Sequence, residues 1–148
     1  MSAPAAKPDL LKLRAEDAED IQVISAMLQD AIVPLCDIVF QDDQKVFVVV
    51  AQRLRRERGE TGAGERVCCA VTIKGVGSVQ TRGIDQKQQT RMLDLLAIMI
   101  EGTSLNLVFA DDAHIRLDLS AWTITVEDFG ESWPALCHPC HEDAAKSL

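Results

Sequence analysis

The sequence contains no tyrosine, and it has only four phenylalanines and two tryptophans among its 148 residues. Proteins that bind single-stranded nucleic acids stack the bases on aromatic side chains, so this shortage argues against such a surface. Positive charge is scarce as well, because 15 lysines and arginines are set against 23 acidic residues, which gives a formal net charge of −8. Nucleic acids and anionic membranes attract clustered positive charge. The composition therefore predicts a protein that binds neither nucleic acid nor membrane.

Long apolar runs are missing too. The first residues, MSAPAAKPDLLKLR, contain no apolar core of the kind found in signal peptides. No later segment has the roughly 18 uncharged apolar residues in a row that a membrane helix requires. These absences predict a cytoplasmic protein. Thiols are kept reduced there, and the odd number of five cysteines fits poorly with a disulfide framework.

Catalytic motifs are also absent, since the chain has no phosphate-binding loop, no G-x-G-x-x-G and no G-x-S-x-G. Cys36, Cys68 and Cys69 lie in apolar strand patterns, where a cysteine serves as a small apolar side chain with a raised pKa. His114 falls in a turn, and nothing in the sequence brings it to a cysteine. An enzyme is not excluded, but the sequence favours a protein without catalytic activity.

A two-residue apolar alternation is the most regular pattern that the chain does have. It covers residues 105–109 and resumes at 115–119 after a polar turn, which predicts a β-hairpin with one solvent-exposed face. The alternation changes phase at Ser120-Ala121, so the apolar positions Trp122, Ile124 and Val126 lie in the other register. Such a change of phase predicts a bend or bulge.

A helix is predicted after Asp17, which is placed as an N-cap before an apolar stripe at helical spacing. The segment 53–65, rich in charge and glycine, predicts a mobile hairpin loop. Residues 93–100 suit either a buried helix or a strand, and Gly102 directly after them favours the strand. Further strands are predicted at residues 10–13, 32–40, 45–51, 67–73 and 78–82, with a turn at Gly75–Gly77.

These signals predict an α+β fold in which an N-terminal amphipathic helix packs on a bent antiparallel sheet of about seven or eight strands. A roll similar to that of pleckstrin-homology domains would accommodate so many short strands, by analogy of architecture alone. The predicted organisation is a flexible tail over residues 1–9, a single domain over 10–133 and a C-terminal tail over 134–148.

The C-terminal stretch Cys137-His138-Pro139-Cys140-His141 matches C-x-x-C-H, the pattern that attaches c-type haem. Haem attachment requires export, and no export signal is visible. Zinc could bind Cys137, Cys140 and His141, but a structural zinc site normally takes its ligands from two separated pairs, and a second pair is missing. The favoured interpretation is therefore a polar tail without metal or cofactor.

Several segments of the chain, at residues 20–31, 81–85, 93–98, 115–118 and 128–130 together with Trp133, form a familiar set in this order. Together they resemble the bacterial family of unknown function DUF2948. The resemblance covers Leu10 to Trp133 and implies a cytoplasmic bacterial protein of about this size, with no known activity or cofactor. The C-x-x-C-H stretch lies outside the family pattern.

The functional hypothesis is a non-enzymatic module that binds or regulates an unidentified protein partner through a sheet edge or the rim Thr81–Asp85. Its candidate binding residues are Arg82, Gly83, Asp85 and Arg116, which occupy predicted strand ends. A pairing of arginine with aspartate that only stabilises the turn is the structural alternative. The rival function is a small enzyme or metal-binding protein that uses the cysteines and histidine of the C-terminal stretch. The sequence does not predict the oligomeric state.

Overall fold

The computed structural model describes residues 11–54, 65–129 and 133–134. The predicted N-terminal tail, most of the predicted 53–65 loop, and the predicted C-terminal tail with its C-x-x-C-H stretch lie outside the described residues, apart from Pro134, which belongs to a short strand. The described elements, in chain order, are β1 (Lys12–Ala15), α1 (Ala18–Leu28), β2 (Ile32–Pro34), the 3-10 turn η2 (Leu35–Asp37), β3 (Ile38–Gln41), β4 (Val46–Leu54), β5 (Glu65–Arg82), β6 (Met92–Glu101), β7 (Ser104–Phe109), β8 (His114–Asp128) and β9 (Trp133–Pro134).

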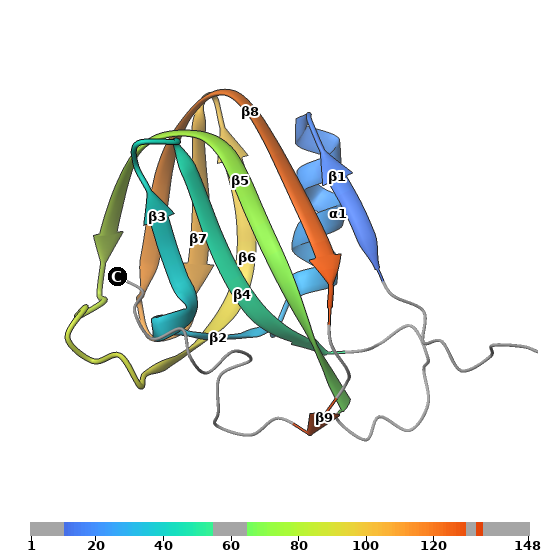
Figure 1. The fold of residues 1–148 in the computed structure, drawn as a ribbon, viewed down its shortest axis with the longest axis vertical. Helices are drawn as coiled ribbons and strands as arrows, with labels where there is room; N and C mark the ends of the chain where they lie inside the picture. Colours follow the sequence, from blue (N-terminus) through green and yellow to red (C-terminus); the bar gives the residue numbers. More distant parts are fainter. Residues whose placement is uncertain (1–10, 55–64, 130–132, 135–148) are drawn as a thin grey trace, which may run out of the picture.

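The strands close into a barrel (Figure 1). Following hydrogen-bonded neighbours, β8 leads to β7, β6, β2, β4 and β5, and β5 pairs with β8 again, so six antiparallel strands form a complete circuit. The strands β1, β3 and β9 are added to its sides. The predicted α+β fold, an N-terminal helix packed on a bent antiparallel sheet, is therefore wrong, because the molecule is mostly β and its sheet is a closed six-stranded barrel with additional strands.

Two long bent strands explain this difference. β5 has 18 residues and β8 has 15, and they pair with each other along most of their length. The predicted turn at Gly75–Gly77 is instead a bend within β5, marked by register shifts between Lys74 and Ser78. Gly75 has φ 91°, and a Cβ on it would lie 2.4 Å from the Ser120 carbonyl oxygen. Opposite the bend, Ala121 has φ 49°, which confirms the predicted irregularity at residues 120–121.

The helix fills one opening of the barrel. One edge of β8 pairs with β7 at residues 114–118 and with β1 at residues 124–127. β7 and β1 therefore diverge along this edge. The helix α1 packs against β1 and β6 at this opening. The Asp17 side chain accepts a hydrogen bond from the Asp20 amide at 2.9 Å, which confirms the predicted N-cap. Ile21, Ile24 and Leu28 are buried in the core. We call this region the helix corner.

A second opening has no comparable helix over it among the residues that the structure describes. β4 pairs with β5 only as far as Lys74, and the Lys45 carbonyl then accepts hydrogen bonds from the amides of Gly75 and Val76. Beyond this point, residues 76–82 pair with β8 on one edge and with no described strand on the other. In Figure 1 the arrowhead of β5 lies at the left margin of the barrel. We call the space between this edge and β3 the open corner.

Several other predicted elements are present. β6 confirms the choice of a strand over residues 93–100, and β7 with β8 confirms the predicted hairpin. The strand predicted at residues 32–40 is interrupted by η2, which separates β2 from β3. Within the described ranges, the molecule has no helix with both the length and the apolar character to cross a membrane.

Candidate functional site

The barrel brings two of the predicted binding residues together on its outer face. Arg82 of β5 lies opposite His114 of β8, and Gln80 lies opposite Arg116. Side chains alternate between the faces of a strand, and Ile115, between His114 and Arg116, is buried in the core. The four polar side chains therefore project outward. We call Gln80, Arg82, His114 and Arg116 the cationic face.

The two guanidinium groups are available to a ligand. Arg82 forms no side-chain hydrogen bond or ion pair within the part of the chain that the structure describes. Arg116 Nε lies 3.8 Å from Asp118 Oδ1, and both side chains are about half exposed. Exposed ion pairs of this kind contribute about 0–1 kcal/mol. Asp118 is held mainly by Ser78, whose hydroxyl donates to it at 2.8 Å. A carboxylate could therefore replace Asp118 at Arg116 at little cost.

His114 is a neighbour of both arginines, because it lies opposite Arg82 and two residues before Arg116 on β8. Its Nε2 is 2.9 Å from Asn106 Oδ1 on β7, so the tautomer with the proton on Nε2 donates a hydrogen bond that fixes the ring. A cavity of about 280 Å³ is lined by Thr81 and the cationic face, and none of these described lining residues is acidic. His114 was not among the predicted site residues. Only the pairing of β8 with β5, which no local pattern reveals, places it opposite Arg82.

Gly83 shapes the rim beside this face. It has a φ of 73°, and a Cβ on it would lie 2.5 Å from the Asp112 carbonyl oxygen. The absence of a side chain thus lets the end of β5 pack against the turn between β7 and β8. A second cavity, of about 690 Å³, lies along this turn and is lined by Arg82, Gly83, Asp111 and Asp112, among others. Its carboxylates make it a poorer anion site than the cationic face.

Asp85 has a different role from the arginines. Its carboxylate accepts a hydrogen bond from the Lys87 amide at 3.0 Å, and its carbonyl accepts one from the Gln88 amide at 2.9 Å. It therefore stabilises its own turn. No ion pair joins it to Arg82 in the described ranges, so the pairing considered as the structural alternative does not form there.

An apolar cavity of about 400 Å³ lies at the open corner. Ile38 and Phe40 of β3 line one side, Val79 and Thr81 of β5 line the other, and Phe47 of β4 lies between them with its ring centroid 6.2 Å from that of Phe40. Thr81 also lines the cavity at the cationic face. The apolar cavity and the cationic face are therefore neighbours that share the last residues of β5.

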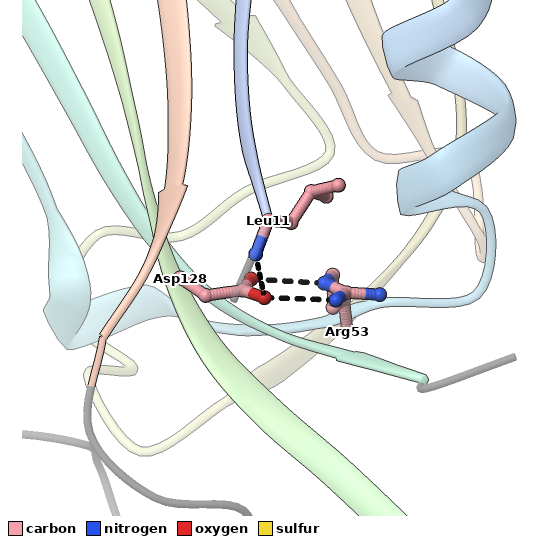
Figure 2. A network of polar contacts seen from close by, with 3 residues as sticks. All are labelled: Leu11, Arg53 and Asp128. Atoms are coloured by element: carbon pink, nitrogen blue, oxygen red, sulfur yellow. Dashed lines mark hydrogen bonds and ion pairs between the residues drawn. The ribbon is translucent and has the colours of Figure 1, made fainter. Parts of the chain in front are cut away.

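A buried ion pair lies at the end of β8 near the start of β1 (Figure 2). Arg53 Nε and Nη2 donate to the two Asp128 carboxylate oxygens at 2.9 and 2.8 Å, and the Leu11 amide also donates to Asp128 at 2.8 Å. The Arg53 and Asp128 side chains are 1% and 0% exposed. Because no ligand can reach these charges, the pair is structural, and it ties the start of β1 to the barrel.

This ion pair was not predicted, because Arg53 begins the segment 53–65 that was expected to form a loop. In fact β4 continues to Leu54, and Arg53 follows Val49 and Ala51 on the inward face of the strand. Asp128 likewise follows Ile124 and Val126 on the inward face of β8. The sequence did contain a signal for this pair. Arg53 and Asp128 each continue an alternation of inward-facing apolar residues, and two opposite charges at inward positions predict a buried ion pair.

The described thiols are poor nucleophiles. Burial, and secondarily the Asp128 carboxylate, raises the pKa of Cys69 to about 12. Partial burial and then Asp37 raise the pKa of Cys36. Cys68 takes part in a disulfide bond, whereas reduced thiols were expected. Nowhere in the described ranges do three histidine, cysteine or acidic side chains gather closely enough to hold a metal ion, and Cys137, Cys140 and His141 lie outside those ranges.

Comparison with known proteins adds a family. A family model described as a protein of unknown function, DUF2948, matches residues 11–141. The chain belongs to the DUF2948 family. The match extends beyond Trp133 and spans residues 137–141, which the sequence analysis had placed outside the family pattern. Searches of curated proteins and of solved structures gave no match. Membership of DUF2948 assigns no activity, so function must be argued from the site.

Proposed function

We propose that this DUF2948 protein is a non-enzymatic binding module whose cationic face recognises carboxylate groups on a partner protein. The observation that carries the proposal is that the two arginine side chains of this face make few polar contacts within the protein. Arg82 forms no side-chain polar contact in the described part of the chain, and Arg116 is held only by an exposed contact of 3.8 Å. A guanidinium presents a planar set of donors that matches a carboxylate, so two of them beside His114 suit an acidic ligand.

The composition of the face supports binding rather than catalysis. Its one imidazole is that of His114, and the described residues that line the cavity include no cysteine, serine or carboxylate that the ring could activate. Nucleophilic catalysis needs a nucleophile within hydrogen-bond distance of a base. Recognition of a carboxylate needs only the arginines and the hydrogen-bond donors around them.

The net charge of the chain makes such a face selective. An acidic partner is repelled by most of a surface that carries a formal net charge of −8, and it is attracted where Arg82 and Arg116 project together. Complementary charge at an interface fixes orientation and increases the association rate more than it increases affinity. The face would therefore orient an acidic partner on this side of the barrel.

The test is affinity capture from the lysate of the host with tagged full-length protein and quantitative mass spectrometry. The variant Arg82→Glu/Arg116→Glu should retain the specific partner at least about tenfold less well, because like charges replace attractive ones. The matched control is Lys45→Glu/Lys74→Glu, which makes the same change in charge at two exposed lysines away from the face. Equal retention of every protein by both variants and the unmodified chain would contradict the proposal.

A further inference from the structure

We infer that the partner contributes an extended segment that pairs with the free edge of β5 at Val79 and Thr81, and that this segment alternates apolar and acidic residues. Its apolar side chains enter the cavity at the open corner, and its acidic side chains lie beside Arg82. This inference rests on the proposed function and specifies the chemistry of the partner.

The backbone of β5 offers hydrogen bonds along this edge. The Leu119 amide donates to the Thr103 carbonyl, and the Phe109 amide donates to the Ala113 carbonyl, so the odd-numbered amides of β8 face β7. The even-numbered amides of β8 then face β5, where they meet Ser78, Gln80 and Arg82. Since backbone groups alternate between the two edges of an antiparallel strand, the N–H and C=O groups of Val79 and Thr81 face the free edge.

The side chains of these residues show what should enter the cavity. Val79 and Thr81 point to the inner face with Ile115 and line the apolar cavity of about 400 Å³ that reaches Phe40 and Phe47. An added strand would lie about 4.8 Å from β5, between this edge and β3, and every second side chain would point inward. Those side chains would fill the space at the open corner, so they should be apolar.

The outward side chains of an added strand would meet a different environment. They would lie beside Gln80 and Arg82 on β5, with Arg116 one strand further on. Opposite charges on neighbouring strands stabilise a sheet, so the outward positions should be acidic. A second copy of this chain does not meet the requirement, because the corresponding outward residues of its own β5 edge are Ser78, Gln80 and Arg82. The fitting occupant is therefore an acidic, alternating segment of another protein.

The probe is a blocked nonapeptide of alternating valine and glutamate, added to full-length ¹⁵N-labelled protein. Amide hydrogen exchange is then followed residue by residue. At saturation, exchange at Val79 and Thr81 should slow at least about tenfold, because their amides become hydrogen-bonded to the peptide. Gln80 and Arg82, whose amides already face β8, should change little and serve as internal controls. A peptide of the same composition with its valines and glutamates in separate blocks should give no protection.

Two variants test the edge directly. Thr81→Pro removes an N–H that faces the free edge and leaves the pairing with β8 intact, so it should weaken peptide binding at least about tenfold. Thr81→Val keeps the N–H and the shape, and it should bind like the unmodified chain. Similar melting temperatures for the two variants and the unmodified chain would show that Thr81→Pro still folds, and the exchange measurement on the unmodified protein does not depend on either variant.

Three results would overturn the inference. In the first, the peptide does not bind at millimolar concentration. In the second, the peptide binds, but exchange at the Val79 and Thr81 amides does not slow. In the third, both amides are already protected in the free protein, and sedimentation shows a dimer. In the second case the loss of partner capture by Arg82→Glu/Arg116→Glu would still support the proposed function. The opposite result is also distinguishable. If the peptide protects the Val79 and Thr81 amides but Arg82→Glu/Arg116→Glu does not change partner capture, the β5 edge binds the peptide and the proposed role of the cationic face is wrong.

Discussion

At each of the two corners of the barrel, neighbouring strands separate and leave an opening, but the two openings are filled differently. At the helix corner β7 and β1 diverge, and α1 places Ile21, Ile24 and Leu28 into the opening. At the open corner no described ladder joins β3 to the last part of β5, and the described residues beside the opening include Ile84 and Gln86 of the polar loop after Gly83. One opening is part of the core, whereas the other keeps an apolar cavity and a free edge.

This difference indicates where stability and binding reside. Side chains in the helix corner have nearly no contact with water, so changes there should reduce stability. Residues of the open corner such as Thr81 are exposed, so changes there should alter binding with little loss of stability. The comparison can be tested by making similar changes on the two sides.

The largest effect is expected from Asp128→Ala. This change leaves Arg53 buried without its carboxylate and releases the Leu11 amide at the start of β1, which leads into α1. Removing one partner of a buried ion pair costs about 3–5 kcal/mol, and we expect a loss of this size in urea unfolding. The control is Asp118→Ala on the same strand, where the carboxylate is exposed and the expected loss is below about 1 kcal/mol. Equal losses would show that the buried pair does not secure the helix corner.

A smaller effect is expected from truncating the apolar residues of the two corners. Ile24→Ala should reduce the free energy of unfolding by about 2–5 kcal/mol, because it leaves a cavity beneath α1. Val79→Ala at the open corner should cost below about 1 kcal/mol, since Val79 is only partly buried beside an existing cavity. Thermal and urea unfolding measure both. The distinction between the corners would be lost if the two variants were equally destabilised.

The smallest effect concerns two glycines with positive φ. Gly102→Ala should cost about 1–2 kcal/mol, which is the strain of a side chain in the left-handed region, because no atom lies within 4 Å of its Cβ position. Gly83→Ala carries the same strain and also places a Cβ 2.5 Å from the Asp112 carbonyl oxygen. It should therefore be less stable than Gly102→Ala by about 1 kcal/mol or more in urea unfolding. The reverse order would argue against a tightly packed rim.

Local patterns predicted most of the elements correctly. The N-cap at Asp17 and the hairpin of β7 and β8 follow from spacing over a few residues, and both are observed. The change of phase at Ser120-Ala121 also corresponds to a real irregularity. These features depend on neighbours in the sequence, which is why the residues alone reveal them.

Closure of the barrel depended on information that no short segment contains. Gly75–Gly77 has the composition of a turn, yet β5 continues through it because β8 bends beside it at Ala121. The same limit applies to the site. Arg82 and Arg116 were predicted separately as rim residues, but their joint position with His114 follows only from the register of β5 against β8.

The pairing of β1 with β8 also governs when the molecule can be completed during synthesis. Lys12 lies opposite Glu127, and the Leu11 amide bonds to Asp128 across 117 positions of the chain. The first strand therefore leaves the ribosome long before its partner exists, and the helix that follows it has no finished barrel to cover. Contacts between distant parts of a chain form slowly because a long loop must close first. The helix packs mainly on β6, so its apolar side has no strand to cover until β6 has also been synthesised.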